Sequence, residues 1–459
     1  MKIKIFLFQG IRLVLLLGFY TQMQAQHIAR LRFEDDFSYI KSDTSSKSWD
    51  ERLKFMPISS SLNVSVGGEW REQYQNYTNA NFGQYPASFT EVSPHQWMHR
   101  MMLHGDFRYR NALRAFVQLN NTTRSLNPNP ITSQLDENQL AVHQWFLEAN
   151  VSKHWLVRAG RQEMLFGQER FVATKEGPNT RQSFLGFTAE GKYPGFKIDA
   201  FYVKPVRMNV GVFDDGLMDE EFGGIYAVKT DKKRKLNVDA YYFHLESTQR
   251  EYVFKRGLEQ RHTAGIRLYS PLGAINYDVE IAHQWGKFNA LDISAWMFVW
   301  DFNAETFKHS YLGFSGNYVP GDESSTDQEL NTFNTLFARP PFGQTVALNI
   351  TNTLNLSPYV RYQAGTKWLA TARASIVTRA SMADGIFTPN MSPLRPLDAN
   401  ASTSKLGVCD IYALEINYVP TKHYFFQAEL GFCQAGNYLK DSGPGKEVVY
   451  FAIRNAIKF

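Results

Sequence analysis

The last twelve residues of the chain, VVYFAIRNAIKF, alternate between apolar and mixed side chains with a period of two. One face carries Val449, Phe451, Ile453, Ile457 and Phe459, with Asn455 as its exception, and the other carries Val448, Tyr450, Ala452, Arg454, Ala456 and Lys458. A period of two is that of a β-strand, because a helix repeats every 3.6 residues. The apolar face covers a core in a soluble sheet and faces lipid in a membrane barrel. This segment alone leaves both alternatives open.

The same alternation recurs along the chain from Leu62 onward. In WMHRMMLHGDFRYR, for example, Trp97, Met101 and Leu103 oppose Arg100 and His104. Similar patterns run through LNVDAYYF, INYDVEIAHQW and YFFQAELGF, and helical spacing fits none of them. About eighteen such segments follow one another, an even number of the kind that bacterial outer-membrane barrels use. The sequence therefore predicts an all-β protein.

The lengths of the connections decide which all-β fold is expected. Short connections at residues 110–111, 152–153, 191–195, 230–235, 271–273, 303–307, 363–366 and 420–423 take turns with long ones. The long ones are 78–96, 121–138, 163–182, 205–221, 246–260, 319–347, 379–403 and 436–446, and only 287–291 breaks their series. A soluble sandwich has no reason to keep loop length in step with strand parity. We therefore predict a transmembrane up-and-down antiparallel β-barrel of about 18 strands, with short periplasmic turns and long extracellular loops.

The N-terminus predicts export from the cytoplasm. Lys2 and Lys4 precede an apolar stretch, and Ala25 suits a cleavage site, so residues 1–25 are expected to be a signal peptide. The alternative is a short membrane anchor. We expect residues 26–60 to form a periplasmic N-terminal segment and residues 61–459 to form the barrel. In the barrel, the last strand has to pair with the first, because lipid does not tolerate an open sheet edge.

Composition narrows the function. The 459-residue chain has a formal charge of only +5, which is too small to argue for nucleic acid as a partner. Aromatic residues make up 15%, a proportion that suits either the aromatic girdles of a membrane barrel or a carbohydrate-binding surface. No cysteine pairs have zinc-type spacing, and we expect no cofactor.

Several motifs resemble the alginate export family of outer-membrane barrels. They are VGGEWREQYQNYTNANFG, VRAGRQEMLFGQERF with RQSFLGF, GNYVPGDESSTDQELNTFNTLF, in which Pro320 replaces a usual serine, and YLKDSGPGKEVVYFAIRNAIKF. The resemblance implies an outer-membrane protein for passive export of an anionic, alginate-like polysaccharide, in contact with outer-membrane lipid. The terminal Phe459 suits recognition by the barrel assembly machinery. The alternative is a general or small-anion porin with no polysaccharide role.

Strand alternation places a set of arginines on the predicted inner face. Arginine suits carboxylates because it donates two parallel hydrogen bonds, and arginine rings are a general device of anion pores. We expect Arg158, within the family motif, to be the best single candidate, whereas the direction of Arg161 after Gly160 stays open. Nine acidic residues share the inner face, so a mixed salt-bridge network is the alternative. The candidate residues are Arg71, Arg100, Arg108, Arg114, Arg158, Arg161, Arg267, Arg361, Arg373 and Arg454.

Three further features leave alternatives open. The loop with Glu163, Glu169, Arg170 and Arg181 is either a gate folded into the barrel or a solvated outer loop. The acidic loops at residues 213–221 and 321–329 could hold calcium, although neither has EF-hand spacing, and we expect no metal site. An enzyme is disfavoured, because His104 points inward with no serine plainly paired to it.

The only two cysteines, Cys409 and Cys433, flank the short turn at residues 420–423. A hairpin centred near Thr421 would place them directly opposite each other, with Ala413 opposite Glu429. We therefore predict a disulfide in the oxidising compartment beyond the inner membrane, with two free thiols as the alternative.

Overall fold

The structure is a computed structural model that describes residues 28–35, 37, 40, 48–85, 95–125, 136–252, 255–324, 326–395 and 403–459. The expected signal peptide at residues 1–25 lies outside the described residues, as does part of the expected periplasmic segment at 26–60.

Eighteen long strands dominate the described chain. They are β2 (Leu62–Thr78), β3 (His95–Tyr109), β4 (Leu113–Arg124), β5 (Asn138–Asn150), β6 (Trp155–Gln162), β7 (Phe184–Tyr193), β8 (Phe196–Arg207), β10 (Glu220–Asp231), β11 (Leu236–Tyr252), β12 (Lys255–Leu272), β13 (Ile275–Phe288), β14 (Leu291–Phe307), β15 (Ser310–Val319), β17 (Thr353–Ala364), β18 (Trp368–Arg379), β19 (Gly407–Thr421), β20 (Tyr424–Ala435) and β21 (Val448–Lys458). The small elements are β1 (Met56–Pro57), β9 (Gly216–Leu217), β16 (Glu329–Leu330), η1 (Arg32–Glu34), η3 (Glu51–Leu53), η4 (Ala80–Gly83) and α2 (Asn437–Asp441).

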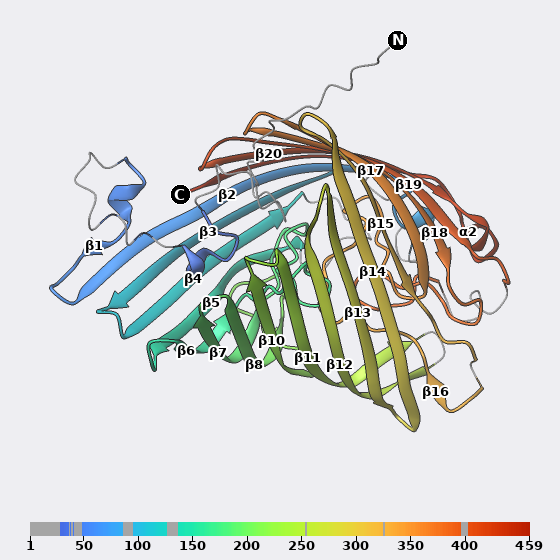
Figure 1. Cartoon of the computed structure of the whole chain (residues 1–459), viewed down its shortest axis with the longest axis horizontal. Helices are drawn as coiled ribbons and strands as arrows, with labels where there is room; N and C mark the ends of the chain where they lie inside the picture. Colours follow the sequence, from blue (N-terminus) through green and yellow to red (C-terminus); the bar gives the residue numbers. More distant parts are fainter. Residues whose placement is uncertain are drawn as a thin grey trace, which may run out of the picture.

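Each long strand pairs antiparallel with the next, and the last closes on the first (Figure 1). At this seam β21 pairs with β2 from Glu69↔Lys458 to Thr78↔Val449. The prediction of a closed, eighteen-stranded up-and-down barrel is therefore confirmed. Among the described residues, no helix combines the length and the apolar character that a membrane crossing requires.

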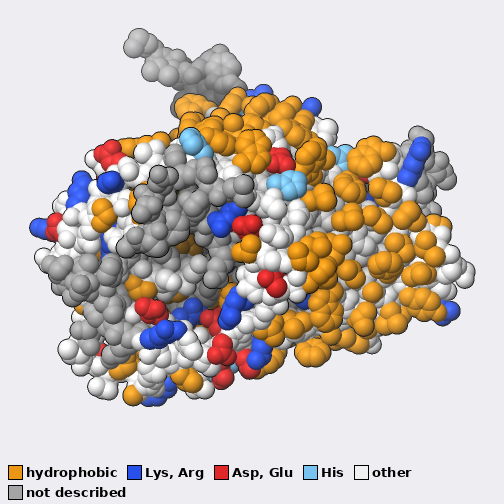
Figure 2. Space-filling view, turned by 180° about the vertical axis from the view of Figure 1, so that it is seen from behind, with side chains coloured by type: hydrophobic (Ala, Val, Ile, Leu, Met, Phe, Trp, Pro, Cys, Tyr) orange, Lys and Arg blue, Asp and Glu red, His pale blue; other side chains and the backbone are white. Residues whose placement is uncertain are grey.

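The period-two pattern translates directly into the two faces of the wall. On β3, Trp97, Met101 and Leu103 are about half exposed, whereas Arg100 and His104 are buried. Hydrophobic side chains accordingly spread over a broad band of the outer surface (Figure 2). Because strand side chains alternate, the same sequence that presents apolar groups outward sends polar groups into the lumen.

Connection lengths agree with the prediction at most positions. One exception lies at residues 246–260, where a long loop was expected and β11 and β12 continue instead. Their ladder extends through Glu246↔Gln260 and, after a register shift, to Tyr252↔Lys255. The correction has a simple cause: polar residues can continue a hairpin once the strands have left the lipid, so polarity alone does not end a strand.

The lumen is largely filled by the chain itself. Phe171 and Val172, from the segment between β6 and β7, and Phe333 and Phe337, from the segment between β15 and β17, are buried against wall residues such as Phe243. Coil segments lie inside the ring of strands as a result (Figure 1). Whatever passes through the barrel must use the space that these segments leave.

The predicted opposition of the two cysteines is wrong. Cys409 pairs with Ala435, Cys433 pairs with Ile411, and both thiols are free and buried. The ladder is irregular between Tyr418 and Thr421, where Pro420 has no N–H to donate. Relative to the predicted register, this irregularity and the turn that begins after Thr421 shift the pairing by two residues. Ala413 therefore faces Gly431 instead of Glu429.

The orientation of the barrel can be tested with single cysteines at opposite ends. Lys233 lies in the exposed turn between β10 and β11, and exposed Asp441 ends helix α2 between β20 and β21. On intact cells, a membrane-impermeant maleimide should label Asp441→Cys and not Lys233→Cys, with the parent chain as background. Labelling of Lys233→Cys alone would reverse the assigned orientation.

The outer wall can be tested at Leu430, which is half exposed on β20 between outward-facing neighbours Leu414 and Phe451. Leu430→Arg should destabilise the folded barrel by about 2–4 kcal/mol if this position lies near the bilayer midplane. Gln434→Arg, at the loop end of the same strand face, is the matched control and should cost at most about 1 kcal/mol. Denaturant titration of folding into lipid vesicles measures both, and equal effects would contradict the assigned lipid-facing band.

Candidate functional site

The inner wall carries nine of the ten candidate arginines at inward-facing positions. Most of them meet a carboxylate on their own or a neighbouring strand. For example, Arg114 pairs with Asp106 at 2.7 Å, and Arg158 pairs with Glu148 at 2.6 Å. The remaining ion pairs of this kind are Arg108–Asp106 at 3.0 Å, Arg114–Glu148 at 3.6 Å, Arg267–Asp278 at 2.6 Å, Arg267–Asp239 at 2.8 Å and Arg100–Glu69. For these residues, the mixed salt-bridge network considered from the sequence describes the wall well.

Arg161 differs from the other nine. It lies near the end of β6 opposite Trp145, whose side chain is exposed on the outer wall. Its guanidinium pairs with Asp215 at 2.8 Å and donates to Ser183 at 2.9 Å. Preceding Gly160 has a φ of +135°, and a Cβ there would lie 2.2 Å from the carbonyl oxygen of Trp145. Arg161 therefore ties the rim of the barrel to the segment after β8.

The loop at residues 163–183, between β6 and β7, folds into the barrel. Thr180, Arg181 and Gln182 are fully buried, so the alternative of a solvated outer loop does not hold. Arg71 on β2 donates to the carbonyl oxygens of Glu176 at 2.8 Å and Pro178 at 2.9 Å. The wall thus holds this inward loop through its backbone as well as through charge.

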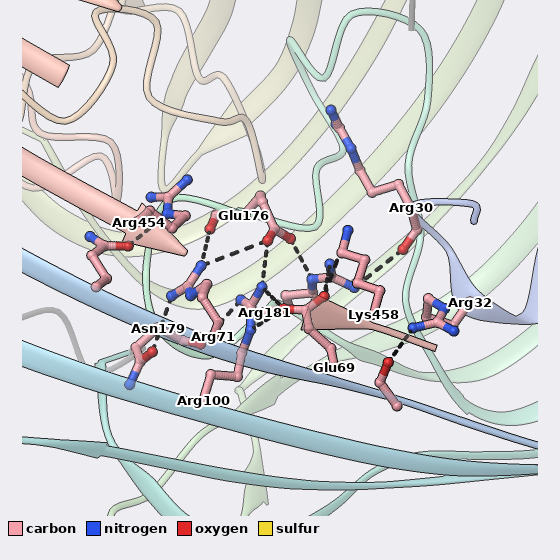
Figure 3. A network of polar contacts seen from close by, with 12 residues as sticks. Arg30, Arg32, Glu69, Arg71, Arg100, Glu176, Asn179, Arg181, Arg454 and Lys458 are labelled. Carbon is pink, nitrogen blue, oxygen red and sulfur yellow. Dashed lines mark hydrogen bonds and ion pairs between the residues drawn. The ribbon is translucent and has the colours of Figure 1, made fainter. Parts of the chain in front are cut away.

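Glu176 is the centre of a charge network between the inward loop and the wall (Figure 3). Its carboxylate pairs with Arg100, Arg181 and Arg71, the last at 3.7 Å. The carboxylate of Glu69 forms ion pairs with Arg100, with Arg181 at 3.5 Å and with Lys458 at 3.7 Å. Burial alone would raise the pKa of Glu176, but the guanidiniums of Arg100, Arg181 and Arg71 outweigh burial and hold the pKa well below its usual range.

A cavity of about 550 Å³ remains between the inward loop, the segment after β15 and the wall from β13 to β21. Arg361, Arg373 and Arg454 line it, and none of the three forms an ion pair with a described residue. Arg454 donates to the amide oxygens of Gln73 at 2.8 Å and Gln427 at 2.9 Å. These three are the candidate arginines that have no carboxylate within ion-pair distance among the described residues, although Asp301, Glu415 and Glu429 line the same cavity.

Arg361 and Arg373 share one aromatic ring. Their guanidinium carbons lie 5.4 Å and 4.7 Å from the ring centroid of Tyr359. The Tyr359 hydroxyl donates to Asp301 at 2.7 Å, and Arg373 donates to the Ser315 hydroxyl. The Nε of Arg361 has no hydrogen-bond partner among the described residues. Stacking on an aromatic face fixes a guanidinium while leaving its N–H edge available to a planar anion.

Some residues around the cavity were not among the candidates. Arg170, in the inward loop, pairs with Asp278 at 3.2 Å and with Glu280, and Arg30 pairs with Glu169. Arg339 lines the cavity from the segment between β15 and β17. Strand alternation could not find these residues because they lie outside the strands, and only the charged loop motif GQERF pointed to Arg170.

The two acidic loops considered for calcium use their carboxylates in other ways. Asp214 accepts from the backbone of Gly211 at 3.0 Å, and Glu220 pairs with Arg250 at 3.0 Å. In the second loop, Asp327 accepts from the backbone N–H of Glu329 at 3.2 Å, and Glu329 accepts from the side-chain amide of Asn331 at 3.3 Å. The described residues contain no cluster of three or more His, Cys, Asp or Glu side chains suited to a metal ion.

The chain shares its fold with solved structures of Pseudomonas aeruginosa proteins. The chain aligns with OpdK in complex with vanillate at 13% identity and a TM-score of 0.59, covering 86% of this chain and 98% of that one. It aligns with OccK2 (OpdF) in complex with glucuronate at 9% identity and a TM-score of 0.57, with the same two coverages. At these identities the likeness shows the fold alone. No curated protein sequence matches the chain.

A sequence model described as alginate export matches residues 62–450, which is nearly the whole barrel. This match agrees with the motifs of the first strand and loop, the segment around Arg158 and the closing strands. The protein is thus an outer-membrane β-barrel, and the chain belongs to the alginate export family.

Proposed function

We propose that this barrel is a passive pore for anionic, carboxylated saccharides, with an alginate-like polysaccharide as its cargo. The observation that carries the proposal is the arrangement of Arg361 and Arg373 around Tyr359, facing the cavity without an ion pair among the described residues. A guanidinium that forms an ion pair with a wall carboxylate contributes little to the electrostatic field in the lumen. A stacked guanidinium without such a match attracts anions, and its planar N–H edge suits a carboxylate.

The uncharged lining of the same cavity also fits a saccharide. Ser315, Ser357, Ser375, Asn355 and Gln427 contribute hydroxyl and amide groups to it. Sugars present hydroxyls that both donate and accept hydrogen bonds, and hydroxyl and amide side chains can do the same. Arginines beside neutral polar groups thus suit a polymer with one carboxylate on each sugar. The proposal is of transport alone, without a catalytic step.

A second candidate, a pore for small carboxylates, is favoured by the size of the cavity. Its volume of about 550 Å³ is within the range of about 300–1,000 Å³ that is typical of small-ligand pockets. OpdK was solved with vanillate and OccK2 (OpdF) in complex with glucuronate, and both of these ligands are small carboxylates. The two candidates share the arginines and differ in whether a chain of linked sugars can follow the first unit.

The arginine assignment can be tested by planar-bilayer recording in a salt gradient. Arg361→Gln with Arg373→Gln should move the reversal potential toward cation preference, because two positive charges leave the cavity lining while its carboxylates stay. Arg110→Gln is the matched control, since Arg110 lies exposed in the turn after β3 and stacks on Tyr109 outside the cavity. It should leave the reversal potential unchanged.

Arg158→Gln separates this site from the candidate that the sequence favoured. Arg158 pairs with Glu148 and stacks on Phe33 at 4.2 Å, so we expect a smaller shift than for the double variant. A larger shift at Arg158, together with no shift for Arg361→Gln and Arg373→Gln, would move the site to the β5–β6 wall. No shift in any of these variants would refute an arginine-based anion filter.

A further inference from the structure

The part of the N-terminal segment at residues 28–35, called here the lumen insert, lies against the inner wall of the barrel. Phe33 packs edge-on against Phe116 of β4 and Phe146 of β5, with ring centroids 6.2 Å and 5.4 Å apart. Leu31 belongs to the same buried cluster, which Leu165 of the inward loop covers. A segment expected in the periplasm thus contributes to the interior.

The lumen insert also contacts the guanidiniums of three candidate arginines. Arg114 donates to the carbonyl oxygen of Phe33 at 2.6 Å, and Arg108 donates to that of Asp35 at 3.2 Å. The guanidinium carbon of Arg158 lies over the Phe33 ring, 4.2 Å from its centroid. Peptide carbonyls and an aromatic ring therefore occupy the positions that the oxygens and the ring face of a bound ligand would take.

We propose that the lumen insert occludes a second binding face for carboxylated saccharides, made of Arg108, Arg114, Arg158, Phe116 and Phe146. This inference rests on the proposed function, because it assigns the same class of ligand to the opposite side of the lumen. The face combines three guanidiniums with two carboxylates, Asp106 and Glu148, which leaves one positive charge. Its two phenyl rings are stacked at 5.2 Å and 13° and offer an apolar platform on which a sugar ring can pack.

Two attachments determine how the lumen insert can move. Arg32 donates to the carbonyl oxygens of Gly68 in β2 at 2.9 Å and of Phe459 after β21 at 2.7 Å, so it bridges the barrel seam. Farther in, Arg181 of the inward loop donates to the carbonyl oxygen of Arg30 at 3.2 Å, and Arg30 pairs with Glu169. The side chains of Leu31 and Phe33, on either side of Arg32, are the part of the insert that is buried in the aromatic cluster. Removing these two side chains should uncover the aromatic rings while Arg32 stays attached at the seam.

The test uses the full chain with Leu31→Ala and Phe33→Ala, compared with the parent protein in planar bilayers. We expect a higher single-channel conductance and stronger anion preference, because the lumen widens on a side that carries excess positive charge. Adding Arg114→Gln and Arg158→Gln to this variant should remove the gain in anion preference while the conductance stays high. Trp49→Ala is the control, because Trp49 is exposed and contacts His423 and Phe459 outside this face.

Unchanged conductance and selectivity in the Leu31→Ala, Phe33→Ala variant would overturn the proposal. If that variant fails to assemble, Phe116→Cys in the otherwise unaltered chain decides the matter, because Phe116 is buried on the proposed face and Leu31 and Phe33 stay in place. Its thiol should react slowly with a charged, water-soluble reagent, with the parent chain and its buried cysteines as background. Rapid modification at once would show that the face is already open and would contradict occlusion.

The reversal potential of the Arg361→Gln, Arg373→Gln variant tests the proposed function separately. Loss of anion preference in their double variant, with no effect of releasing the insert, would leave the main cavity as the pathway and refute the second face. The reverse pattern would support the second face and refute the assigned main cavity.

Discussion

Backbone hydrogen bonding across the seam between β2 and β21 is the constraint on which the rest of this structure depends. In a bilayer, an unpaired strand edge has no water to satisfy its N–H and C=O groups, so the sheet has to close. Closure fixes which face of each strand meets lipid and which meets the lumen. The period of two then sends nearly every strand arginine inward, whatever its later role. Arg32 reinforces the same seam by donating to carbonyl oxygens on both of its strands.

Inward placement alone does not make an anion filter. Arg267 is matched by Asp239 and Asp278 on neighbouring strands, an arrangement that stabilises the wall and cancels its field, whereas Arg108, Arg114 and Arg158 share only Asp106 and Glu148. The inward loop neutralises others by bringing Glu176 against Arg71 and Arg100. What remains is asymmetric: the loop and the lumen insert fill one side of the lumen, and arginines without an ion pair line the other. The proposed function follows from this asymmetry.

The sequence predicted the barrel well because the determinants of the barrel are local. Alternation is read within one strand, and the alternation of short and long connections gives the strand number and topology. A pair such as Arg158 and Glu148 is also near in sequence, across one short turn. The same local reading failed at residues 246–260, where polar strands continue, and at the cysteines, where one irregularity near Pro420 moved the register. Long-range contacts were out of reach, since nothing near Phe33 or Glu176 in the sequence reveals that each one meets distant arginines.

Arginines in the lumen that form no ion pair should select carboxylated saccharides. The most direct measurement is single-channel current through the wild-type pore while an oligouronate or a neutral oligosaccharide of equal length is added. The oligouronate should interrupt the current at far lower concentration than the neutral sugar. Substituting Arg361 and Arg373 with glutamine should remove that difference. Equal interruption by both sugars in the wild-type pore, or by neither, would contradict the account.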